Sequence, residues 1–194
     1  MSLKKAVFLA MILLLMGSLL MLSLGCSREP ENKTFSNHGF SFKYPAKFSV
    51  TERGLYDYVA NDISGVVEAF REDDEIEMFQ TIWVHTRPGE LESTDDLQIM
   101  LEDAFAGIES VENIAGFDTS ELVETTKSGQ ELLYQYYTFN FVGGDRVNGI
   151  VGVFYCEGGQ KLFRLSTMNS TISDRQDVLE DFQRYLDSFV CHQS

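Results

Sequence analysis

The sequence lacks the short motifs that mark the common enzyme classes. It contains no Gly-x-Ser-x-Gly motif, no P-loop and no dinucleotide-binding fingerprint. Only three histidines occur in 194 residues, and no two of them have the i, i+4 spacing with which one helix face holds a metal ion. A catalytic triad assembled from distant residues has no support in the sequence. We therefore expect a protein that is not an enzyme and has no cofactor and no metal site.

Basic residues are also scarce. The chain has 15 Lys and Arg against 30 Asp and Glu, a net charge of −15 at pH 7. Lys4 and Lys5 precede Cys26 and all acidic residues follow it, so the part after Cys26 has 13 basic and 30 acidic residues, a net charge of −17. A field of this sign repels nucleic acid, so we expect no nucleic-acid partner. Solubility explains the charge, and a cationic partner or metal ions remain alternatives.

The only long hydrophobic run lies at the N-terminus. Residues 6–25 are apolar apart from Ser18 and Ser23, and two lysines stand ahead of them, as in an export signal. The stretch Leu22-Ser23-Leu24-Gly25-Cys26 resembles a lipobox, the site at which prokaryotic lipoproteins are diacylated on Cys and cut just before it. Ser23 and Leu24 depart from the residues that this motif prefers.

These features predict a membrane-anchored protein. We expect residues 1–25 to be a lipoprotein signal peptide, Cys26 to carry the lipid, and residues 26–33 to form a polar tether. The alternative is an uncleaved transmembrane helix, because a run of 20 residues is long enough to span a bilayer. In both cases the following domain lies at the cell membrane, outside the cytoplasm.

Residues 34–190 are long enough for one domain with its own core, and strand signals dominate them. The expected strands are residues 40–44, 65–70, 76–86, 132–142, 147–156 and 162–168. The connections at 143–146 and 157–160 are short and rich in glycine, which is typical of antiparallel hairpins.

Two helices are expected among these strands. The first begins near Ser93 or Thr94, with acidic residues in its first turn. The second begins at Ser173, with Gln176 three residues later as a capping box. Each helix has one apolar face, and strand 132–142 has apolar residues on both faces. We therefore predict an α+β fold, a twisted antiparallel β-sheet flanked by helices.

Two stretches carry a family resemblance. HGFSFKYPAKFSV (38–50) is similar to the opening hairpin of PsbP-like proteins, although Phe48 stands where the family commonly has Trp. KLFRLSTMNSTISDRQDVLEDFQRYLDSFV (161–190) is similar to their closing strand and helix. The resemblance implies a PsbP-like α/β/α sandwich over residues 34–190. It also implies a non-enzymatic role, in which the domain binds or helps to assemble a protein partner at the membrane surface.

A ligand site, if there is one, is expected at aromatic residues. Trp83 and His85 alternate on one strand face, and Tyr134 and Tyr136 also combine ring surface with a polar tip. Convergence of these four residues on one cavity would favour the alternative function, a lipoprotein that binds a small molecule or a metal ion. Packing in the core is the competing explanation for each of them. An envelope hydrolase would need a Ser or Asp beside His38 or His85.

Cys156 and Cys191 form a candidate disulfide. The strand that ends at Cys156 is followed by a returning strand and then by the last helix, which must run back toward Cys156. A helix of 18 residues spans about 27 Å and a strand of nine about 30 Å, so the ends roughly match. An oxidising compartment would permit the bridge. The alternative is two free thiols.

Overall fold

The computed structural model describes residues 32–59, 62–71, 75–86, 94–144 and 146–192. The expected signal peptide, the lipidated Cys26 and nearly all of the expected tether lie outside the described residues. Within these ranges, no helix is both long enough and apolar enough to cross a membrane.

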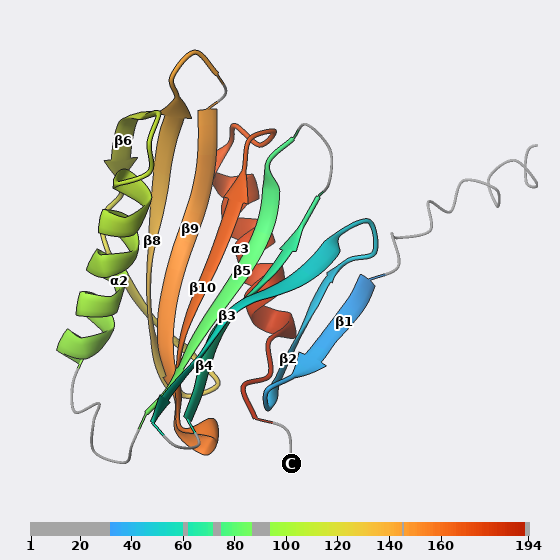
Figure 1. The fold of residues 1–194 in the computed structure, drawn as a ribbon. Coiled ribbons are helices and arrows are strands. Elements are labelled where there is room, and N and C mark those ends of the chain that lie inside the picture. Colours follow the sequence, from blue (N-terminus) through green and yellow to red (C-terminus); the bar gives the residue numbers. More distant parts are fainter. Residues whose placement is uncertain (1–31, 60–61, 72–74, 87–93, 145, 193–194) are drawn as a thin grey trace, which may run out of the picture. The chain divides into compact units, whose positions relative to one another are not determined.

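An antiparallel sheet of eight strands forms the centre of the domain (Figure 1). Its strand order is β3-β4-β5-β10-β9-β8-β6, and β7 also pairs with β8. The strands are β3 (Ser49–Val59), β4 (Asp62–Phe70), β5 (Glu77–His85), β6 (Ile114–Thr119), β7 (Val123–Lys127), β8 (Gln130–Phe141), β9 (Arg146–Cys156) and β10 (Lys161–Asn169). A short 3-10 turn, η1 (Glu157–Gly159), joins β9 to β10.

The predicted hairpins 132–168 are confirmed as β8, β9 and β10, and residues 65–86 as β4 and β5. Strands β3, β6 and β7 were not predicted. β6 and β7 are edge strands whose residues are mostly exposed, so they lack the apolar alternation that marks a half-buried strand. A register shift between Ala115 and Asp118 further breaks the pattern of β6.

The opening hairpin lies one strand earlier than the sequence suggested. β1 (Asn32–Asn37) and β2 (Phe40–Pro45) form a separate two-stranded sheet, and residues 46–50, the end of the expected hairpin, lead into β3 of the large sheet. The turn residues His38 and Gly39 have φ values of +54° and +76°, as a tight two-residue hairpin turn requires. The resemblance thus placed the opening hairpin at residues 38–50, whereas its two strands and their turn span residues 32–45.

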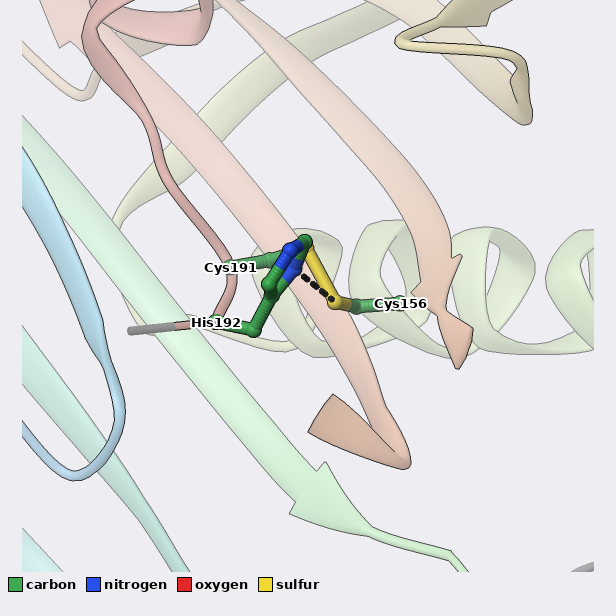
Figure 2. A group of neighbouring side chains, drawn as sticks. All are labelled: Cys156, Cys191 and His192. Carbon is green, nitrogen blue, oxygen red and sulfur yellow. Dashed lines mark hydrogen bonds between the residues drawn. A yellow bond between two sulfur atoms is a disulfide. The ribbon is translucent and has the colours of Figure 1, made fainter. Parts of the chain in front are cut away.

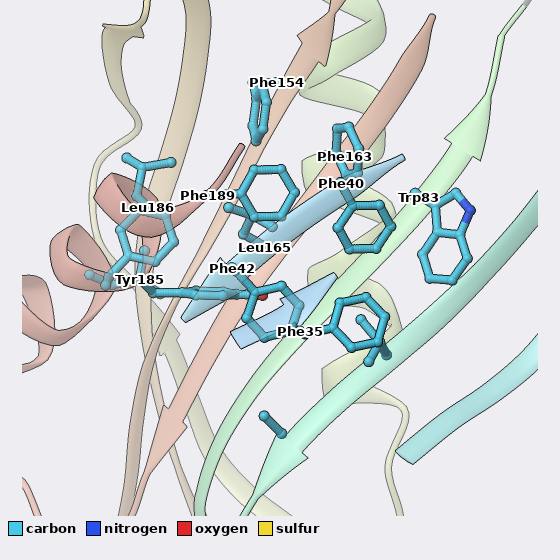
Figure 3. Close-up of a cluster of buried hydrophobic side chains, with 14 of the residues drawn as sticks. Phe35, Phe40, Phe42, Trp83, Phe154, Phe163, Leu165, Tyr185, Leu186 and Phe189 are labelled. Carbon is cyan, nitrogen blue, oxygen red and sulfur yellow. The ribbon is translucent and has the colours of Figure 1, made fainter. Parts of the chain in front are cut away.

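Helices and the hairpin cover the two faces of the sheet. α2 (Thr94–Glu109) packs on β8 and β9 on one face, and α3 (Arg175–Ser188) packs on β9, β10 and β2 on the other. The aromatic cluster between α3, the hairpin and the sheet includes Phe40, Phe42, Phe163 and Phe189, all buried (Figure 3). The predicted α+β sandwich is confirmed.

The start of α3 corrects one prediction. The helix begins at Arg175, and Asp174 is its N-cap: the Asp174 carboxylate accepts a hydrogen bond from the backbone N–H of Gln176 at 2.7 Å. The capping box predicted for Ser173 and Gln176 is therefore wrong. Asp and Ser are both strong cap residues, so two candidates side by side leave the boundary open by one position.

Candidate functional site

Trp83 and His85 lie on β5, on the face toward the hairpin. Trp83 has no exposed surface, and its ring stacks on the imidazole of His38, with 4.7 Å between the ring centroids. Nε2 of His38 lies 3.0 Å from Oε2 of Glu52. His85 is half-buried, one position before the end of the described part of this segment. Trp83 is thus a core residue that holds the hairpin turn.

Tyr134 and Tyr136 lie on β8, on the same face of the sheet. β10 and β9 separate β8 from β5, which puts the two pairs roughly 14 Å apart across the sheet. The Tyr136 hydroxyl donates to Oδ1 of Asn148 at 2.6 Å, and Arg175 lies over the Tyr136 ring. The structure does not bring the four sequence-predicted ligand residues together.

Tyr134 does line a groove. This groove, with a volume of about 310 Å³, runs between β7 and α3 and is lined in part by Tyr134, Phe182 and Leu186. An ion pair of 3.4 Å between Lys127 and Asp187 crosses it. The two charged side chains in the groove wall, Lys127 and Asp187, therefore already pair with each other.

The C-terminal segment is joined to the end of β9. A disulfide connects Cys156 and Cys191, with 6.1 Å between their Cα atoms, and the ring of His192 lies against both sulfur atoms (Figure 2). Gly159 makes room for this approach, because a Cβ there would lie 2.8 Å from the carbonyl oxygen of Cys191. The three side chains are close enough to share a metal ion, but the bonded sulfurs offer no thiolate ligand.

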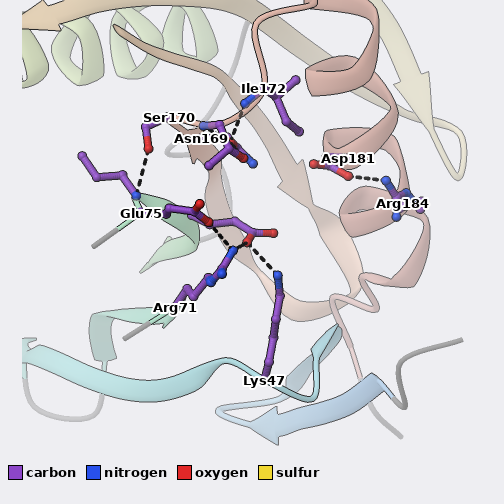
Figure 4. A network of polar contacts seen from close by, with 11 residues as sticks. Lys47, Arg71, Glu75, Asn169, Ser170, Ile172, Asp181 and Arg184 are labelled. Atoms are coloured by element: carbon purple, nitrogen blue, oxygen red, sulfur yellow. Dashed lines mark hydrogen bonds and ion pairs between the residues drawn. The ribbon is translucent and has the colours of Figure 1, made fainter. Parts of the chain in front are cut away.

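Ion pairs also satisfy the charged groups around Glu77. Its carboxylate pairs with Lys47 at 2.9 Å and with Arg71 at 3.5 Å, and Arg71 pairs with Glu75 (Figure 4).

Asp181 pairs with Arg184 beside a pocket of about 230 Å³. Burial raises the pKa of Asp181, and the nearby Glu77 raises it further. The neighbouring acidic run at residues 72–75 lies outside the described residues except for Glu75.

The face of the sheet that carries α2 is only half covered. α2 lies over β8 and β9 (Figure 1). The side chains of β4 and β5 on that face stay partly exposed among the described residues. On the opposite face Val67, Ala69 and Trp83 have no exposed surface. We call the partly exposed region the open face; its residues are Val66, Glu68, Phe70, Met78, Gln80, Ile82 and Val84.

A pocket of about 200 Å³ lies where the open face meets α2. We call it the α2 pocket. Its walls are Ala104, Gly107 and Ile108 of α2 and Val111 after it, Met78 and Gln80 of β5, Tyr137 of β8, Val151 of β9, and Arg164, Ser166 and Met168 of β10.

Of the described residues in the wall of the α2 pocket, Arg164 is the only charged one. Its side chain is half-buried, and within the described ranges no carboxylate forms an ion pair with its guanidinium. Burial lowers the pKa of Arg164, and Tyr137 and Asp103 offset part of that effect. The sequence analysis missed this residue. Its signal was an arginine at an alternating position of a strand whose other face, Phe163 and Leu165, is apolar.

This architecture is the PsbP-like fold. Among solved structures, the chain is similar to the solution structure of cyanobacterial PsbP (CyanoP) from Synechocystis sp. PCC 6803. The TM-score is 0.56 at 15% sequence identity, over 86% of this chain and 95% of that chain. No protein-family model matches the sequence. A search of curated proteins found no match either.

Proposed function

We propose that this chain is a non-enzymatic, lipid-anchored module that binds or helps to assemble a protein partner outside the cytoplasm, at the cell membrane. The open face carries the proposal. Its exposed Val84 and half-buried Met78 and Ile82 form an apolar centre, with Arg164 at its edge on β10. Protein interfaces combine such an apolar centre with polar neighbours, and they are enriched in Met and Arg.

The partner in this proposal has a basic surface. The part of the chain after Cys26 carries a net charge of −17, as counted above, and opposite charge speeds encounter and suppresses wrong partners. Binding should therefore weaken as salt is added.

Two matched substitutions test the docking surface in the full-length, membrane-anchored protein. Val84→Glu places a charge on the open face, and Val142→Glu places the same charge on an exposed hairpin tip. We expect in-cell cross-linking to recover a protein that also binds the purified chain, and Val84→Glu to remove that cross-link while Val142→Glu keeps it. Equal cross-linking by both variants, or no specific partner, would contradict the proposal.

The lipid anchor on Cys26 has its own test. Metabolic labelling with palmitate should mark the native chain and leave Cys26→Ser unmarked, because the Cys26 sulfur is the atom that receives the lipid. A native chain that stays in the membrane without incorporating the label would favour the transmembrane alternative.

The second candidate function is the binding of a small molecule. The α2 pocket, with its unmatched guanidinium, is the observation that favours it.

A further inference from the structure

The α2 pocket differs from the other two cavities described above in the balance of its charges. Each of those cavities holds an ion pair, Lys127 with Asp187 in one and Arg184 with Asp181 in the other, and Lys43 in the wall of the second is exposed to water. Arg164 has no such partner among the described residues. A charge taken partly out of water is costly unless a counter-charge approaches it.

The other polar groups in the pocket wall are already engaged. The Ser166 hydroxyl donates to Oε1 of Gln80 at 3.4 Å, and Nε2 of Gln80 donates to Oε1 of Glu68 at 2.9 Å. The Tyr137 hydroxyl donates to the carbonyl oxygen of Thr167 at 3.1 Å. The guanidinium is therefore the polar group in the wall that still has donors for a ligand. Its planar fork of N–H donors matches a carboxylate.

The rest of the wall is apolar. Met78, Ile108 and Met168 surround the guanidinium with hydrocarbon and thioether groups, and methionines adapt to ligands of different shape. A volume of 200 Å³ equals the share of liquid volume taken by about seven waters, which suits a ligand with a body of a few carbon atoms.

Gly107 leaves space beside this pocket. It stands inside α2, where glycine is less favourable than alanine, and a Cβ added to it would meet no atom within 4 Å. A larger side chain would therefore fill open space rather than collide with the helix or the sheet.

We propose that the α2 pocket binds a small organic carboxylate with a short apolar body, held by an ion pair between its carboxylate and the guanidinium of Arg164. One guanidinium balances one negative charge. A phosphate group carries up to two, in a chain whose net charge is already −15. The α2 pocket adjoins the open face and shares Met78 and Gln80 with it, but binding of the carboxylate does not require the protein partner.

Hexanoate is the probe for this site, added to the full-length chain labelled with carbon-13 at the methionine methyl groups. We expect saturable shifts of the Met78 and Met168 signals, since both side chains line the pocket. Hexanol has the same body without the charge, and inorganic phosphate has charge without the body. Neither should reproduce the shifts at the same concentration.

Three variants complete the test. Arg164→Gln should weaken hexanoate binding about tenfold or more, because it removes a charge-assisted pair. Gly107→Leu should abolish the shifts by filling the pocket, and Arg146→Gln, at the exposed start of β9, should leave the affinity unchanged. Thermal unfolding of each variant checks that it is folded.

Several results would overturn the proposal. They are the absence of saturable shifts, equal affinity for hexanol, stronger binding of phosphate, and unchanged hexanoate affinity in a folded Arg164→Gln variant. The Val84→Glu experiment reads out cross-linking to a protein partner, whereas this one reads out methionine methyl shifts. Either the docking proposal or the carboxylate proposal can therefore fail without the other.

Discussion

Trp83 shows how a residue type can indicate two opposite roles. A lone tryptophan beside a histidine on one strand face is typical of a ligand patch, yet the indole is buried between Phe40 and His38. His38 lies far from Trp83 in the sequence, and only the positive-φ turn of the hairpin brings its ring there. The sequence could not distinguish these roles, because core and interface both favour large aromatic side chains.

The contact between His38 and Glu52 predicts a pH-dependent stability. The hydrogen bond from His38 is the largest cause that lowers the pKa of Glu52. A carboxyl with a lowered folded-state pKa stabilises the fold above its ordinary pKa, about 4.3, and loses that contribution as pH falls through the lowered value. Glu52→Gln should therefore reduce stability at pH 7, by at most about 1 kcal/mol for so exposed a pair.

Thermal unfolding of Glu52→Gln at several pH values measures this effect. The melting temperatures of the variant and the native chain should converge below the lowered pKa of Glu52, where its carboxyl is protonated in both states. Glu124→Gln, on the exposed edge strand β7, is the control and should change nothing. A difference that persists at low pH would show that the hydrogen bond to His38 is not the cause.

At the scale of elements, the N-cap of α3 allows a direct comparison of two neighbouring residues. Asp174→Ala removes the acceptor for the Gln176 N–H and should destabilise the domain by about 1 kcal/mol. Ser173→Ala changes the residue that the sequence favoured as the cap and should have almost no effect. Denaturant unfolding of both variants measures the difference, and a larger loss for Ser173→Ala would contradict the assigned cap.

The long strands and both helices could be predicted because their apolar residues repeat with a clear period. Strand β9 is buried along nearly its whole length, and α3 buries Val178, Phe182, Tyr185 and Leu186 on one face. β7 offered no such pattern, since its sequence VETTK is polar and its place is set by pairing with β8. The α2 pocket could not be predicted from the sequence either. Arg164 and Gly107 come to line one pocket only because α2 packs on the sheet.

At the scale of the whole molecule, the bond between Cys156 and Cys191 closes a loop over 35 positions of the chain. A loop of this length predicts about 3 to 4 kcal/mol of stabilisation, chiefly by restricting the unfolded chain. Intact mass with and without reductant should differ by two protons, and reduction should lower the stability by about that amount. Cys191→Ser should be as unstable as the reduced chain and insensitive to reductant. Equal masses would rule the bond out.

The pairing of Ser41 with Val190 has a mechanical consequence. The two residues exchange backbone hydrogen bonds of 2.8 Å, and Cys191 beside them is covalently held to β9. A force drawn along the chain at Asn32 loads the two-stranded sheet first, and its release would lengthen the chain by about 45 Å. The next element under load would be β3, the strand that follows β2 at the edge of the large sheet. The hairpin would thus yield first, while the disulfide keeps the C-terminal segment that pairs with it attached to the end of β9.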